Sequence, residues 1–220
     1  MIMGNNTRLD FLDEVLGETK RGELFLVCGR PGVGKTRFIT TIASKALQKG
    51  IACQIFTQEE YAKNIKARMG IDWQSEPPNL SICEEGNLNK ESLNGKIVNS
   101  TQFVFIDYLQ LYGSEGATLE QKLTELKEIS QRKNVAVIVV GQVSRGLQHI
   151  FPRTRLQVQW LKDKENVWKY PLISCIDTLL FIDAYGARID NREKDCNHSF
   201  TDFIVVKGKM IGSYAYDFNR

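Results

Sequence analysis

The sequence predicts an α/β fold in which a mainly parallel sheet is covered by helices on both faces. Three observations support this prediction. Short, almost continuously apolar runs, which are typical of buried parallel strands, alternate along the chain with helical patterns. Residues 29–36 fulfil the phosphate-binding loop pattern G-x-x-x-x-G-K-[ST] between such a strand and such a helix. Polar residues follow several apolar runs, at the strand ends where ligands bind in parallel sheets.

The composition is that of one cytoplasmic domain. A chain of 220 residues can bury a substantial core but is short for two domains, so we expect a single domain over residues 1–220. The net charge of +3 neither requires nor excludes a polyanionic partner. The five cysteines are scattered without a C-x-x-C pair, which argues against disulfides and zinc and favours a reducing compartment. No apolar run approaches the ~18 residues of a membrane helix, so we expect no membrane association.

The phosphate-binding loop lies where its chemistry requires it. The apolar run at residues 24–28 precedes it, and apolar residues at helical spacing follow it as far as residue 47. Glycines in such a loop let backbone N–H groups face the phosphates, while Lys35 reaches the β and γ oxygens and the Thr36 hydroxyl binds magnesium. The dipole of the following helix adds to the attraction. The candidate nucleotide-binding residues are Gly29, Arg30, Pro31, Gly32, Val33, Gly34, Lys35, Thr36 and Arg37.

The other elements follow from the same patterns. Further strands are predicted at residues 52–57, 80–83, 103–107, 136–140, 178–183, 203–207 and 214–218. Helices are predicted within residues 7–23, through residues 61–69, and from a capping box of Thr118 and Gln121 to Ile129. The polar stretch from residue 70 to residue 100 predicts no element besides its short strand. The last two strands are expected to pair as a hairpin around residues 210–212.

Polar residues after three of these strands are candidates for a hydrolytic site. Asp107 ends its apolar strand and is the expected magnesium partner opposite Thr36. Glu59 and Glu60 are both candidates for the base that orients an attacking water, and at least one of them is only a carboxylate favoured at a helix start. Gln142 offers an amide that would sense the γ-phosphate.

Five segments occur in the order and at roughly the spacing of one known family. Residues 29–36, 56–59, 106–111, 141–145 and 206–212 resemble the RecA-type motor domain of DnaB-like replicative helicases, and the string I-D-Y-L-Q-L at residues 106–111 is the most specific. The resemblance runs from about residue 7 to the C-terminus and implies a RecA-like P-loop NTPase fold with a C-terminal hairpin. Paired glutamates beside residues 56–57 are also similar to those of the KaiC-type and RadA-type branches of this superfamily.

The resemblance also implies roles for single residues. Lys35 and Thr36 would bind ATP and Mg²⁺, with support for the ion from Asp107. Glu59 would be the catalytic base. Gln142 would couple the state of the γ-phosphate to loops that face DNA.

The same family completes each ATP site with a K-x-R pattern from the neighbouring subunit of a ring. Lys207 and Lys209 occupy the matching positions and are further catalytic candidates, although Lys209 stands where a planar arginine fork is usual. The alternative is two solvent-exposed lysines. The resemblance implies a homo-oligomer such as a hexameric ring. The lead before residue 24 is too short for the helicases' N-terminal domain and linker helix, so we expect neither.

A basic and aromatic segment, residues 145–170, is the candidate nucleic-acid contact. It holds six basic and two acidic residues, a local excess larger than the +3 of the whole chain, with four aromatic residues between them. Positive charge with stackable rings is what single-stranded DNA binding uses. The alternative is a solvated insertion whose rings pack back on the body. The candidate DNA-binding residues are Arg145, Arg153, Arg155, Lys162 and Lys164.

Two functions of different classes fit these observations. The first is an ATP-hydrolysing helicase-type motor that acts on single-stranded DNA in DNA replication. The second is a nucleotide-dependent adaptor or loader, or a regulatory RecA/KaiC-like ATPase, with little or no helicase activity. Lys209 and the short N-terminal lead favour the second.

Overall fold

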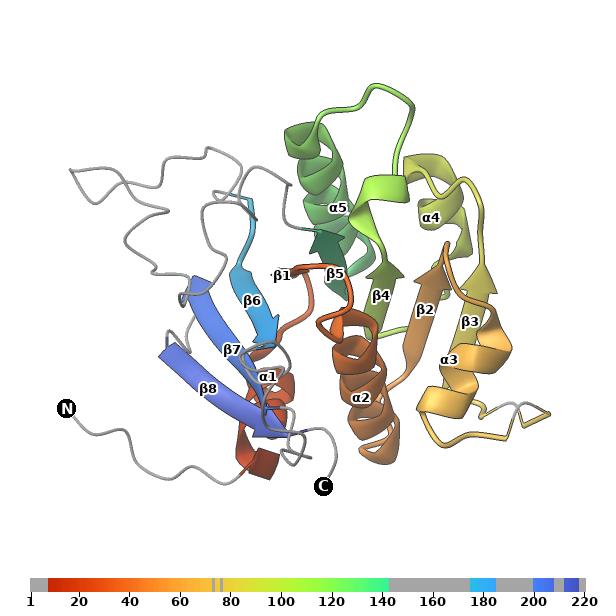
Figure 1. Ribbon diagram of the computed structural model, residues 1–220. Helices are drawn as coiled ribbons and strands as arrows, with labels where there is room; N and C mark the ends of the chain where they lie inside the picture. Colours follow the sequence, from red (N-terminus) through yellow and green to blue (C-terminus); the bar gives the residue numbers. More distant parts are fainter. Residues whose placement is uncertain are drawn as a thin grey trace, which may run out of the picture.

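An eight-stranded sheet runs through the molecule in the order β3-β2-β4-β5-β1-β6-β7-β8 (Figure 1). The computed structural model describes residues 8–72, 74–75, 77–142, 175–184, 200–207 and 212–217. The strands are β1 (Leu24–Gly29), β2 (Cys53–Thr57), β3 (Leu80–Glu84), β4 (Phe103–Asp107), β5 (Ala136–Gln142), β6 (Thr178–Ala184), β7 (Phe200–Lys207) and β8 (Gly212–Asp217). Strands β1 to β6 pair in parallel, whereas β7 and β8 add an antiparallel edge. The predicted mainly parallel sheet with a C-terminal hairpin is confirmed.

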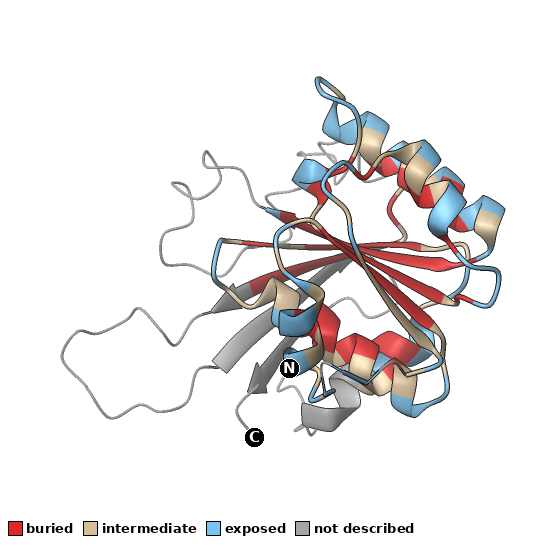
Figure 2. Cartoon of the chain, turned by 90° about the vertical axis from the view of Figure 1, so that its right-hand side faces the viewer, coloured by how far each residue is buried: buried red, intermediate tan, exposed pale blue. Residues whose placement is uncertain are grey.

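Helices cover both faces of this sheet. They are α1 (Arg8–Glu18), α2 (Lys35–Gln48), α3 (Ala62–Arg68), α4 (Lys90–Lys96), the 3₁₀ turn η1 (Leu109–Leu111) and α5 (Leu119–Lys133). In Figure 2 the helices lie in two layers, one on each side of the buried strands. Among the described residues, no helix is long and apolar enough to cross a membrane.

The two faces of the sheet make two separate cores because side chains alternate along each strand. In β1, Phe25 and Val27 pack with buried residues of α1, α2 and α3, whereas Leu24 and Leu26 pack with those of α4, η1 and α5. The interior strands are therefore apolar on both sides, which is why they read as continuous hydrophobic runs in the sequence.

Helix α4 corrects the prediction that residues 70–100 hold nothing besides a short strand. It begins with a capping box in which the Asn89 side chain accepts from the Ser92 N–H, and the Ser92 hydroxyl meets the Asn89 N–H. Only Leu93 within this seven-residue helix is buried. A single buried residue gives no helical period, so hydrophobic spacing cannot reveal this helix. By contrast, the capping box predicted at Thr118 and Gln121 is confirmed at the start of α5.

The sheet order places the candidate residues close together. Strands β2, β4, β5 and β1 are consecutive neighbours, and their carboxyl ends share one edge of the sheet. Gly29 at the end of β1 pairs with Gln142 in β5, and Thr57 at the end of β2 pairs with Asp107 in β4. The chain reverses its direction of growth at β1, which lies between β5 and β6, and ligands of open parallel sheets bind at such a point.

Candidate nucleotide-binding site

The phosphate-binding loop joins β1 to α2, and two of its glycines are required by its shape. A Cβ atom at Gly29 would lie 2.8 Å from the Ile182 carbonyl oxygen and 2.8 Å from Cγ2 of Val33. Gly34, the residue before α2, has a φ of 96°, in the left-handed region that favours glycine. The loop can therefore bring its backbone close to a ligand at the start of α2.

Lys35 begins α2 and is held over the loop. Its Nζ donates a hydrogen bond of 2.7 Å to the Arg30 carbonyl oxygen. Partial burial lowers the pKa of Lys35, and the negative charges of Asp107 and Glu59 act in the opposite direction. The lysine thus lies in the negative field of the carboxylates and is restrained by its own loop.

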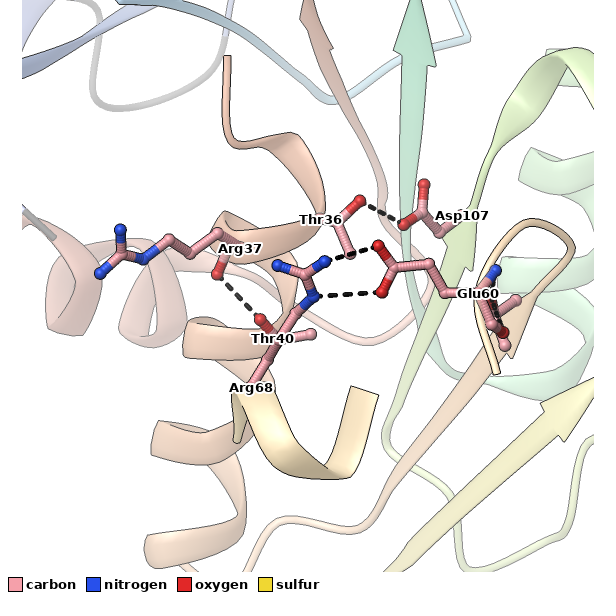
Figure 3. Close-up of polar contacts among 7 residues, drawn as sticks. Thr36, Arg37, Thr40, Glu60, Arg68 and Asp107 are labelled. Carbon is pink, nitrogen blue, oxygen red and sulfur yellow. Dashed lines mark hydrogen bonds and ion pairs between the residues drawn. The ribbon is translucent and has the colours of Figure 1, made fainter. Parts of the chain in front are cut away.

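Thr36 and Asp107 are in direct contact across the edge of the sheet. The Thr36 hydroxyl donates a hydrogen bond of 2.6 Å to Oδ2 of Asp107, as Figure 3 shows. Asp107 is only 4% exposed. Burial raises the pKa of Asp107, the Thr36 hydrogen bond lowers it, and the charges of Glu59 and Glu60 raise it further. Two residues far apart in the sequence therefore form one oxygen-rich site at the end of β4.

The two glutamates after β2 have different surroundings. The Glu60 backbone is held by the Thr57 hydroxyl, which accepts from the Glu60 N–H and donates to its carbonyl oxygen. The Glu60 carboxylate accepts two hydrogen bonds from Arg68, from Nη2 at 2.7 Å and from Nε at 3.1 Å (Figure 3). Glu59 is exposed, and its carboxylate is in hydrogen-bonding contact with the Tyr108 hydroxyl. Burial, followed by the negative charge of Glu59, raises the pKa of Tyr108.

These side chains surround a cavity of about 520 Å³, within the size range of small-ligand sites. Residues of the phosphate loop, of α2, of the segment after β2, of α3 and of the ends of β4 and β5 line it. They are Pro31, Gly32, Gly34, Lys35, Thr36, Arg37, Glu59, Glu60, Arg68, Asp107, Tyr108 and Gln142. The structure thus brings together the predicted Lys35, Thr36, Glu59, Asp107 and Gln142.

Gln142 is fixed through its backbone rather than through its side chain. Its carbonyl oxygen accepts a hydrogen bond of 3.1 Å from Nε2 of Gln110, and the Gln110 carbonyl oxygen accepts 2.9 Å from Nζ of Lys122 in α5. The 3₁₀ turn after β4 is thereby tied to the end of β5. A displacement at Asp107 and a displacement at Gln142 would be transmitted through the same short segment.

The remaining predicted residues lie elsewhere. Lys207, the last residue of β7, pairs with Leu179 near the amino end of β6, whereas Gly29 pairs with Ile182 further along that strand. Lys207 is thus about 10 Å along the sheet from the level of Gly29, at ~3.3 Å per residue, and on the side away from the cavity. Outside the described residues lie Lys209, Arg145, Arg153, Arg155, Lys162 and Lys164.

Sequence reasoning missed three residues of this region: Arg68, Tyr108 and Gln110. Tyr108 and Gln110 belong to the recognised string at residues 106–111, but the string alone does not say which neighbours they contact. Arg68 is eight residues after Glu60, and its contact depends on the direction that α3 takes after β2. A strong hint would have required the orientation of that helix, which periodicity does not provide.

Comparison with known proteins supports the resemblance. Residues 4–95 match the family model of the DnaB-like helicase C terminal domain. The chain is therefore a relative of the DnaB-like helicases. Replicative DNA helicase DnaB of Rhodothermus marinus is 24% identical over 86% of this chain and 24% of its own length. Replicative DNA helicase DnaC of Bacillus subtilis is 26% identical over 67% of this chain and 41% of its own length. The chain thus spans less than half the length of these two DnaB-like relatives.

Solved structures establish the fold. A phosphate-loop protein solved as an isolated ATPase domain superposes with a TM-score of 0.71 and 18% identity, covering 98% of this chain and 87% of that domain. At this level of identity the likeness concerns the architecture alone. It confirms the predicted RecA-like fold.

Proposed function

We propose that the chain binds ATP with Mg²⁺ in this cavity and hydrolyses it, as a DnaB-like motor that acts on single-stranded DNA in replication. The observation that carries the proposal is the contact between Thr36 and Asp107, in a cavity shared with Lys35 and Glu59. Its relatives named replicative DNA helicases support the DNA-directed part.

The donor set fits a magnesium-bound triphosphate. Mg²⁺ prefers oxygen ligands and is usually held by one or two carboxylates together with substrate phosphates. Thr36 and Asp107 would hold the ion, and the loop between Gly29 and Lys35 would hold the phosphates. Bound Mg²⁺ would neutralise charge that develops on the β and γ oxygens. The buried Asp107 carboxylate, whose pKa is raised mainly by desolvation, is well suited to a cation.

The residues of the chain divide the chemistry between them. Lys35 would leave its loop carbonyl contact for the β and γ oxygens. Glu59, exposed at the cavity, would accept hydrogen bonds from the attacking water and orient it toward the γ-phosphate. Glu60, whose carboxylate is already engaged by Arg68, would not serve as this base.

Two further parts of the proposal concern partners. Gln142 lines the cavity and directly precedes the segment that contains the basic residues proposed to contact DNA, which supports a link between phosphate state and DNA contact. Lys207 lies at the other edge of the sheet, which supports its use at the site of a neighbouring copy rather than at its own. We propose a homo-oligomer on this basis, with Lys207 and Lys209 reaching the adjacent cavity.

DNA dependence and assembly test this proposal together. Phosphate release by the full chain with Mg²⁺-ATP is expected to rise at least several-fold when single-stranded DNA is added, because DNA contact orders the partners of each site. Light scattering with nucleotide should give a mass above that of the 25.1 kDa monomer. Double-stranded DNA of equal phosphate concentration is the control. A persistent monomer whose hydrolysis ignores DNA would contradict the motor.

A further inference from the structure

Arg68 places a positive charge at the cavity from within the same chain. It is the last residue of α3, a helix that follows the two glutamates and packs Ile65 into the core. The Glu60 carboxylate grips its guanidinium in two places, and both residues line the cavity that also holds Lys35 and Thr36. In Figure 3 the guanidinium points back from α3 toward the Glu60 side chain.

The guanidinium retains capacity for a ligand. A guanidinium has five N–H donors in a planar fork, and within the described part of the chain Glu60 takes two of them. The other three are available to acceptor oxygens in the cavity. Phosphate oxygens match this geometry, because arginine can bind them through two parallel hydrogen bonds.

The ion pair contributes little to folding. The Arg68 side chain is 44% exposed and the Glu60 side chain is 25% exposed. Ion pairs with this exposure typically stabilise a protein by only about 0–1 kcal/mol. Replacing Arg68 should therefore leave the fold intact, and its effect on a ligand can be measured without loss of the protein.

The charge balance of the cavity also requires a cation here. Glu59, Glu60 and Asp107 bring three carboxylates to a site proposed for a polyanion. Arg68 neutralises Glu60, and its remaining donors lie on the side of the glutamates, across the cavity from Lys35. A terminal phosphate between these two sides would have a positive charge on each of them.

We propose that Arg68 binds the terminal phosphate of the triphosphate in cis, with Glu60 holding the guanidinium in position. This inference rests on the proposed function and deepens it, since it names a residue that distinguishes a nucleoside triphosphate from a diphosphate. Each chain thus carries its own γ-phosphate guanidinium, whatever a neighbouring copy adds.

Nucleotide affinity measured by fluorescence titration tests the role of Arg68. The probes are labelled ADP and a labelled, non-hydrolysable ATP analogue, with the full chain and Mg²⁺. Arg68→Ala is expected to weaken the analogue about tenfold, equal to about 1.4 kcal/mol, and ADP by less than about twofold. Lys63→Ala is the matched control, because it removes a positive charge from the same helix at a side chain that lies over Tyr61 and does not line the cavity. It should change neither affinity.

A double variant separates phosphate contact from simple neutralisation of Glu60. If Arg68 only shields the phosphate from Glu60, then Glu60→Gln combined with Arg68→Ala will restore the affinity for the analogue, and the inference is overturned. If Arg68 contacts the phosphate, the double variant stays weak while Glu60→Gln alone keeps its preference for the triphosphate. Equal losses for ADP and the analogue, or no loss, would also overturn the inference. Failure of the wild type to bind either nucleotide would overturn the proposed function and this inference with it.

Discussion

Glu59→Gln is expected to abolish ATP turnover while leaving nucleotide binding intact. Glutamine has the same shape but cannot accept a proton, so the attacking water would lose its general base, an effect of about 10²–10⁴-fold on the rate. Binding should persist because the loop, Lys35 and Thr36 are unchanged. Phosphate release and nucleotide affinity, measured on the same preparation, check both parts of this result.

Glu60→Gln is the matched control, since it makes the same chemical change one residue away. The carboxylate of Glu60 is engaged by Arg68 and its backbone by Thr57, so it is a structural neighbour of the reaction. Its turnover should stay within about threefold of the wild type, an effect far smaller than that of losing a general base. Normal turnover in Glu59→Gln together with a loss in Glu60→Gln would assign the base to the other glutamate.

Asp107→Asn is expected to stabilise the nucleotide-free protein and to remove Mg²⁺-dependent nucleotide binding. Burial raises the pKa of Asp107, which means that the folded protein disfavours its charged form. Asparagine carries no charge and can still accept the hydrogen bond from Thr36. A gain of ~1 kcal/mol would raise the midpoint of thermal unfolding by about 2–4 °C for a chain of this size. Such a trade of stability for function is common at active sites.

The sign of the pH dependence follows from the same shift. An acid whose folded pKa is raised costs no stability below its unfolded pKa, and the full cost is present above its folded pKa. The advantage of Asp107→Asn should therefore be greatest at neutral pH and should shrink as the pH falls toward the ordinary aspartate value of 3.8. Glu115→Gln, at an exposed loop position, serves as control and should show no such trend. A lower unfolding midpoint for Asp107→Asn at pH 7 would contradict this explanation.

The fold could be predicted from the sequence because its strands are buried on both faces. Runs such as residues 103–107 and 136–140 are apolar throughout, and this pattern marks interior strands of a parallel sheet. The prediction failed for α4, where the Asn89 capping box defines the helix and only Leu93 is buried within it. Helices that depend on capping rather than on an apolar stripe leave no period to read.

The candidate site could be predicted in part, for a related reason. Gly29, Asp107 and Gln142 end neighbouring strands, so strand ends alone bring them to one edge of the sheet. The different surroundings of Glu59 and Glu60 could not be predicted, because they depend on Arg68 at the far end of α3. The direction of Lys207 away from its own cavity depends on the antiparallel pairing of β7 with β6, which fixes the edge at which that residue lies.

Mg²⁺-dependent phosphate release by the full chain tests the central claim most directly. With ATP and single-stranded DNA present, the wild type should release phosphate continuously. Chelation of the metal should stop this release, and so should Lys35→Ala, which removes the ammonium group held over the loop. A wild-type rate equal to that of Lys35→Ala, with metal and DNA both present, would contradict the assignment of this cavity as a site of triphosphate hydrolysis.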